Sequence, residues 1–155
     1  MQKINKIFSL IVIALLLFIQ SCAATGSFSE EAYNKAVTLK VESLQLMGKA
    51  TEEYSKHTDE INSLTYNLKI AYEYSKGRPD NEITTKQWEI MISPDRNLIG
   101  GFLNIWKDDQ KLSAVFVDEA QKVISDAFDT IIGLESGKIK QSELPAGQSD
   151  NQEEK

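Results

Sequence analysis

Cysteine and histidine are almost missing from this chain of 155 residues, which contains one of each. The single cysteine, Cys22, excludes an intrachain disulfide. The single histidine, His57, argues against zinc hydrolases and di-metal helical bundles, because both use more than one histidine. A catalytic serine would have to use His57 as its base, and no serine stands in a nucleophile-elbow context. The sequence therefore predicts no metal site, no cofactor and no enzyme activity.

Basic residues and long apolar runs are also scarce. Seventeen Lys and Arg stand against 23 Asp and Glu, for a net charge of −6, which argues against a nucleic-acid partner. The main apolar run, from Ile7 to Ile19, is shorter than the roughly 20 residues that a membrane-spanning helix needs. Because Lys3 and Lys6 precede this run and small residues follow it, the pattern is typical of a secretory signal.

The segment that follows the apolar run is Ile19-Gln20-Ser21-Cys22. It resembles the leader of bacterial lipoproteins, in which an apolar residue at −3 and a small residue at −1 precede a cysteine. Ile19 and Ser21 match these positions, whereas Gln20 departs from the small residues that are commonest at −2. The resemblance covers only the leader and Cys22.

This resemblance implies cleavage between Ser21 and Cys22, a thioether-linked diacylglycerol on Cys22, and acylation of the new amino terminus. Two or more acyl chains hold a protein stably at a bilayer. Ala23 stands where enterobacterial lipoproteins retained in the inner membrane carry Asp, so the outer membrane is expected in a Gram-negative organism. The alternative is a signal peptide without lipidation, in which Cys22 is an incidental thiol.

Four segments follow from this interpretation. We expect a signal peptide over 1–21, a lipidated tether over 22–29, a helical domain over 30–137 and a disordered tail over 138–155, which has few apolar side chains. Removal of the leader with its two lysines would lower the net charge from −6 to −8.

Apolar and weakly apolar residues recur every three or four positions from Tyr33 to Tyr72, which indicates helical structure. Ser27–Glu30 has the spacing of a capping box. Gly77, with a Pro close behind, is expected to end the helix in the left-handed conformation. One unbroken helix over 29–76 is favoured. A break near His57–Asp59, with its Thr or Asp as a cap, is the alternative and would give a helical hairpin.

The last predicted helix has the clearest apolar face. Asp108 or Asp109 is expected to cap its start, and Gly137 to end it. Its face is too wide for a two-stranded seam, so we expect it to pack against more than one neighbour. The residues of this face are Leu112, Val115, Phe116, Ala120, Val123, Ile124, Ala127, Phe128, Ile131, Ile132 and Leu134.

Two shorter helices are predicted between the long elements, near 85–92 and 94–107. Thr84–Trp88 forms a second capping box, and Ser93 precedes a Pro that suits a first helical turn. Residues 89–92 could alternatively form a strand. The predicted fold is an all-α bundle of three to five helices with two long antiparallel helices and a disordered C-terminal tail.

Polar residues offer two candidate sites. On a helix, Glu53, His57 and Glu60 would share one face, where they could meet a divalent metal, although a solvated polar face is the favoured interpretation. Arg78 and Arg96 each lie in a junction that contains a Pro.

The two arginines admit two interpretations. They could fix the connections of the bundle through bidentate pairs with Asp. Alternatively, they could form an anion or partner site at one end of the bundle, shaped by Trp88, Trp106 and the Gly100-Gly101 pair. Tryptophans at helical spacing more often belong to the core, and paired glycines more often allow close helix packing.

Two function classes remain open. The favoured one is a non-catalytic, lipid-anchored envelope protein whose bundle binds another envelope protein or itself. A long exposed apolar stripe on the first helix would support it. The alternative is a sensory or protective module that binds a small molecule or ion, which an enclosed pocket lined by Trp88, Trp106 and Tyr side chains would support.

Overall fold

Five α-helices and one short 3₁₀-helix make up the part of the chain that the computed structural model describes, residues 28–140 and residue 144. The leader, Cys22 and most of the predicted tail lie outside these residues. No strand occurs in the described residues, so the predicted all-α class is confirmed and the strand alternative over 89–92 is wrong. The elements are α2 (Glu30–Met47), η2 (Tyr54–His57), α3 (Thr58–Lys76), α4 (Glu82–Ile92), α5 (Ile99–Asp109) and α6 (Ala114–Glu135).

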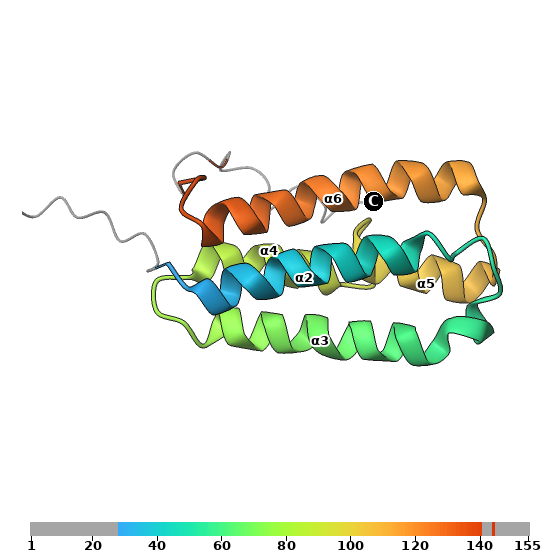
Figure 1. Ribbon diagram of the computed structural model, residues 1–155, viewed down its shortest axis with the longest axis horizontal. Helices are drawn as coiled ribbons and strands as arrows, with labels where there is room; N and C mark the ends of the chain where they lie inside the picture. Colours follow the sequence, from blue (N-terminus) through green and yellow to red (C-terminus); the bar gives the residue numbers. More distant parts are fainter. Residues whose placement is uncertain (1–27, 141–143, 145–155) are drawn as a thin grey trace, which may run out of the picture.

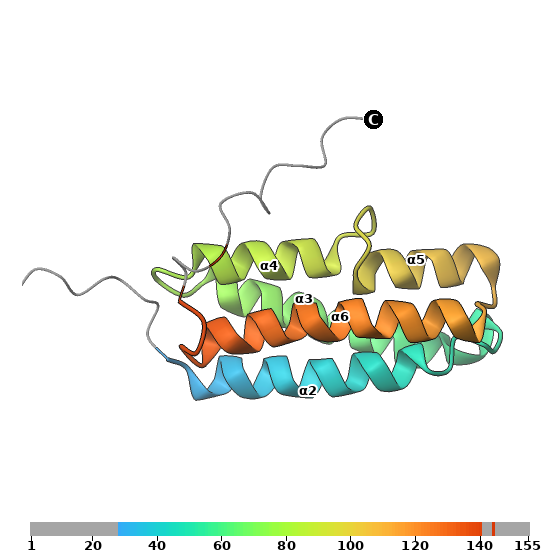
Figure 2. The same cartoon turned by 90° about the horizontal axis from the view of Figure 1, so that it is seen from above.

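The helices form four antiparallel rods, and α4 and α5 lie end to end as one interrupted rod (Figures 1 and 2). Helix α2 packs against α3 and α6, and α4 packs against the same two helices from the other side. The start of α2 and the end of α6 therefore lie at one end of the bundle, which we call the tether end (Figure 2). None of the described helices is long and apolar enough to cross a bilayer.

The favoured unbroken helix over 29–76 is wrong, because α2 ends at Met47 and α3 begins at Thr58. The hairpin alternative is confirmed, and its predicted break near His57–Asp59 matches the start of α3. The predicted cap is wrong, because no side-chain oxygen caps α3. An unbroken helix would leave its apolar stripe without a partner, whereas the hairpin packs α2 against α3. The connection is fixed at the far end of the bundle, where the Leu112 N–H donates to the Ala50 carbonyl at 2.8 Å.

Two predicted caps are replaced by nearby serines. Ser29, rather than Ser27, caps α2, and its hydroxyl accepts a hydrogen bond from the Ala32 N–H at 3.2 Å. Ser113 caps α6 in the same way through the Phe116 N–H at 3.2 Å. The expected caps Asp108 and Asp109 are instead the last residues of α5.

The glycine predictions are right about position and partly wrong about conformation. Gly77 follows the last residue of α3 but keeps a right-handed φ of −78°, and the positive φ of this turn, 53°, belongs to Asp80. Gly137 lies just beyond α6 with a φ of 69°. Ile139 then folds back, so that its side chain covers Gly133 and its N–H donates to the Gly133 carbonyl at 3.0 Å.

The core lies between the four rods. Helix α2 contributes a different face from the predicted stripe. Val41, which the three- and four-residue spacing placed in the stripe, is exposed, while Ala36 and Leu39 are buried. Close to the centre, the ring of Trp88 meets that of Phe128 edge-on, with centroids 6.0 Å apart. The fully buried large side chains are Trp88, Trp106, Phe128, Met47, Met91, Ile99, Ile124 and Ile131.

The interruption between α4 and α5 corrects the predicted helix over 94–107. Residues 93–98 form a loop, and Pro94 cannot continue α4 because it lacks an N–H. This loop packs onto the first turn of α5. A Cβ atom added to Gly100 would lie 2.3 Å from the Ile92 carbonyl oxygen, and one added to Gly101 would lie 1.9 Å from that of Arg96. The glycine pair therefore permits a close contact of two backbones.

This contact predicts opposite outcomes for two glycine substitutions. Gly101→Ala should lower the free energy of unfolding by about 1–3 kcal/mol or more, because a backbone oxygen occupies the space of the new methyl group. Gly77→Ala is the matched control, since its nearest neighbour would be 3.5 Å away and its φ suits alanine. It should change stability by no more than about 1 kcal/mol. Urea unfolding followed by circular dichroism measures both, and equal effects would contradict the assigned contact.

Candidate functional site

The structure does not bring the predicted arginines together. Arg78 follows α3 and Arg96 lies in the loop after α4, so the eleven residues of α4, about 16 Å of helix, separate the two junctions. Arg78 forms an ion pair with Glu135 at the end of α6, and the side chains are only 12% and 2% exposed. Removing one partner of such a pair typically costs about 3–5 kcal/mol, so Arg78 fixes the tether end of the bundle.

Both tryptophans belong to the core. Trp88 is 2% exposed, and Trp106 is fully buried with its indole N–H donating to the Glu52 carbonyl at 3.1 Å. Trp106 also meets the Tyr54 ring edge-on, with centroids 5.6 Å apart. Arg78, Arg96, Trp88 and Trp106 therefore form no common site. Cys22 and the cleavage position after Ser21 lie outside the described residues.

His57 lies between two carboxylates, although not the predicted pair. Its Nδ1 is 3.2 Å from Glu60 Oε1, and its Nε2 is 3.4 Å from Glu52 Oε2, without hydrogen-bond geometry at Nε2. Glu53 turns away to pair with Lys111 at 2.9 Å. Hydrogen bonds from Lys49 and then from His57 lower the pKa of Glu60. These side chains already contact one another, and no metal-binding group of His, Cys, Asp and Glu occurs in the described part of the chain.

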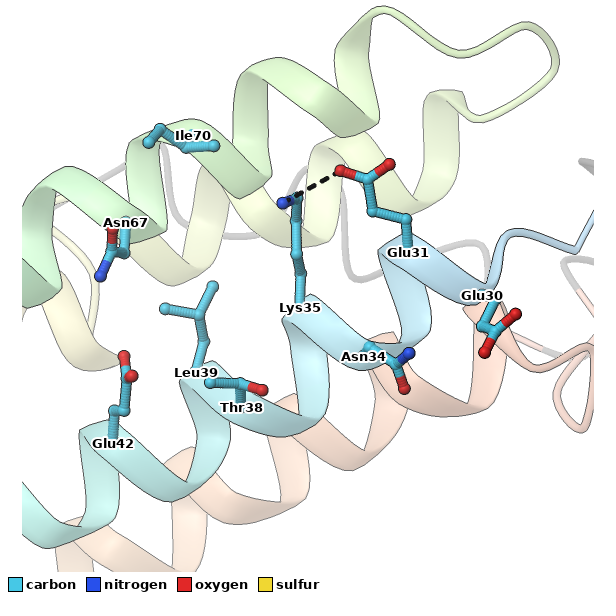
Figure 3. Close-up of a pocket in the computed structure, with 9 residues that line it drawn as sticks. All are labelled: Glu30, Glu31, Asn34, Lys35, Thr38, Leu39, Glu42, Asn67 and Ile70. Carbon is cyan, nitrogen blue, oxygen red and sulfur yellow. Dashed lines mark ion pairs between the residues drawn. The ribbon is translucent and has the colours of Figure 1, made fainter.

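One hollow lies along α2 and α3, and its walls are charged and open (Figure 3). Its volume is about 720 Å³, and Figure 3 shows Lys35 of α2 reaching toward Glu31 at the same helix surface, an ion pair of 3.1 Å. Neither tryptophan lines this hollow. Because the hollow is open and its one lysine already pairs with Glu31, it is a weak candidate for a site that encloses a ligand.

A smaller groove between α5 and α6 has the opposite character. Its volume is about 230 Å³, and its lining is mostly apolar. Phe102 of α5 and Phe116 of α6 stack in parallel at its centre, with centroids 6.1 Å apart and planes inclined by 7°. The lining residues are Asn97, Leu98, Phe102, Ile105, Phe116, Glu119, Ala120, Val123 and Ile124.

Exposed apolar side chains gather around this groove. Ile105, Phe116 and Val123 are 37%, 40% and 54% exposed, and the neighbouring Val115 is 73% exposed. Burying one such side chain completely contributes about 1.5–3 kcal/mol, so covering the group would yield a substantial free energy of association. We call the groove with these four residues the α5–α6 face. A contiguous apolar surface of this kind marks an interaction site more often than a scattered residue does.

The sequence held one signal for this face. Phe116, Val123 and Val115 belong to the wide apolar surface predicted for the last helix, which was expected to meet more than one neighbour. The structure uses the side of α6 that carries Ile124, Phe128 and Ile131 for the core and leaves the α5–α6 face open. Val41, Tyr66 and Ile70 are also exposed on α2 and α3, but the exposed apolar residues that line a groove with a mostly apolar lining lie on α5 and α6.

Comparisons with protein-family models, with curated proteins and with solved structures find no match to this chain. The assignment of the α5–α6 face as the candidate site therefore rests on its exposure and chemistry.

Two adjacent residues of α6 test this assignment. Val123→Ala should change the free energy of unfolding by about 0.5 kcal/mol or less, because Val123 is 54% exposed at the α5–α6 face. Ile124→Ala should cost about 2–5 kcal/mol, because Ile124 is 1% exposed in the core. Chemical denaturation of both variants gives the comparison. A large loss from Val123→Ala would show that this residue is covered within the domain.

Proposed function

We propose that this chain is a lipid-anchored protein of the bacterial cell envelope. Its helical bundle would bind another envelope protein through the α5–α6 face and catalyse no reaction. The exposed apolar groove between α5 and α6 is the observation that carries the interaction. The resemblance of Ile19–Cys22 to a lipoprotein leader supports the anchor.

The positions of the tether and of the α5–α6 face in the bundle support this proposal. Residues 23–29 connect Cys22 to the start of α2, and seven residues extend over at most about 24 Å. The bundle is therefore held close to the bilayer by its tether end. The α5–α6 face lies toward the opposite end, where α5 and the first half of α6 run side by side (Figure 2). Such a face would meet a partner that also resides at the envelope.

The alternative of a small-molecule module has weaker support. It called for an enclosed pocket lined by the two tryptophans, whereas Trp88 and Trp106 are buried in the core. The hollow along α2 and α3 is open and charged, and the α5–α6 groove is smaller than the roughly 300–1,000 Å³ typical of ligand pockets.

The anchor is tested at Cys22. Cys22→Ala should abolish incorporation of an alkynyl fatty acid and release the chain from the membrane fraction, because the acidic surface offers no polybasic substitute. Cys22→Ser serves as a second variant that preserves side-chain size. Persistent membrane association of both variants without labelling would contradict the lipid anchor.

The interaction is tested in intact cells by a photoreactive amino acid placed at single positions. At Val123 it should form a discrete adduct with another protein, because this position lines the groove. At Tyr66, which is 66% exposed on α3 and lies outside the α5–α6 face, it should form none. Absence of an adduct at 123, or the same adducts at both positions, would refute the binding face.

A further inference from the structure

The α5–α6 face is bordered by acidic residues. Glu119 lines the groove, Asp109 follows Ile105 by four residues on α5, and Asp126 follows Val123 by three residues on α6. Residues three or four apart share one helix surface, so these carboxylates flank the apolar side chains. In residues 28–140, Lys122 pairs with Glu119 at 3.0 Å, while no basic side chain pairs with Asp109 or Asp126. With three carboxylates and one lysine, the border therefore has a net charge of −2.

The shape of the face limits what it can hold. A groove of about 230 Å³ is too small for a typical ligand site but can receive individual apolar side chains. It runs between two helices, and amphipathic helices are commonly recognised by laying their apolar face into such grooves. The occupant should therefore present an apolar stripe to Ile105, Phe116 and Val123.

We propose that the α5–α6 face binds an amphipathic helix of another protein whose apolar stripe is flanked by Lys or Arg. This proposal rests on the proposed function, since it names the partner of the same surface. The apolar stripe fills the groove, and the flanking cations meet Asp109 and Asp126, with Glu119 shared between Lys122 and the partner. Complementary charge of this kind fixes the partner and its register more than it adds affinity.

Other occupants fit the border less well. Residues 141–155 of this chain contain a single large apolar residue, Leu144, and four acidic residues, so they match neither the groove nor its charge. A symmetric second copy would place Asp109, Glu119 and Asp126 opposite the same acidic border. Anionic lipid would meet like charge in the same way.

Two synthetic helical peptides of about five turns test the proposal. Both carry the same leucine stripe, flanked by lysines in one peptide and by glutamates in the other. Each is titrated against the mature, acylated chain held in uncharged phosphatidylcholine nanodiscs, with fluorescence anisotropy as the readout. The lysine peptide should bind at least about tenfold more tightly than the glutamate peptide, and high salt should reduce this ratio.

Three variants separate charge from apolar contact. The combination Asp109→Asn, Glu119→Gln and Asp126→Asn should remove the preference for the lysine peptide while both peptides still bind. Val123→Ser should weaken both peptides by about tenfold, because it takes an apolar contact from the groove. Tyr66→Ser, outside the α5–α6 face, should change neither affinity.

Several results would overturn the proposal. Equal affinity for the two peptides would refute the claim that the partner is basic. It would not refute the binding face, because the adduct at Val123 tests that face separately. Failure of both peptides to bind would also refute the proposal. Self-association of the chain that is lost in Val123→Ser would refute it too, because a second copy would then be the occupant. Binding of the Cys22→Ala chain to protein-free anionic vesicles that is lost in Val123→Ser would refute it as well, because lipid would then be the occupant.

Discussion

The close contact between the loop 93–98 and the first turn of α5 is the constraint on which the candidate site depends. Carbonyl oxygens of Ile92 and Arg96 occupy the space that side chains at Gly100 and Gly101 would need. The rod opposite α2 is therefore two helices with a loop between them rather than one. Helix α5 makes its main helix contact with α4, and the stacked rings of Phe102 and Phe116 bridge it to α6. The open groove follows from this arrangement.

Both ends of the bundle are fixed by polar contacts, so the groove belongs to a well-defined surface. At the tether end, the buried pair of Arg78 and Glu135 joins the α3–α4 turn to the end of α6. At the far end, backbone hydrogen bonds join the α2–α3 connection to the α5–α6 connection, and the Trp106 indole donates to the Glu52 carbonyl. The chemistry-bearing residues of the sequence are largely used for these structural contacts. What remains available on the surface is apolar area with an acidic border.

The helical class, the end of α3 at Gly77 and the wide face of the last helix could all be predicted from the sequence, because each depends on local spacing. The hairpin could be predicted only as an alternative, because tertiary packing decides it and Gly48, where α2 ends, is a weak local signal. The capping residues Ser29 and Ser113 were missed because several nearby residues can cap a helix. Exposure of Val123 beside buried Ile124 depends on where α5 lies, which follows from the backbone contact at Gly101.

The lone cysteine makes a direct measurement available. If Cys22 is acylated, Val123→Cys or Tyr66→Cys introduces the only free thiol, and its maleimide labelling rate reports how accessible that position is. The central claim is that another protein covers the α5–α6 face in the cell. It predicts that position 123 labels much more slowly in intact cells than in the purified chain, whereas position 66 labels at the same relative rate in both. Equal protection at the two positions, or none at 123, would contradict it.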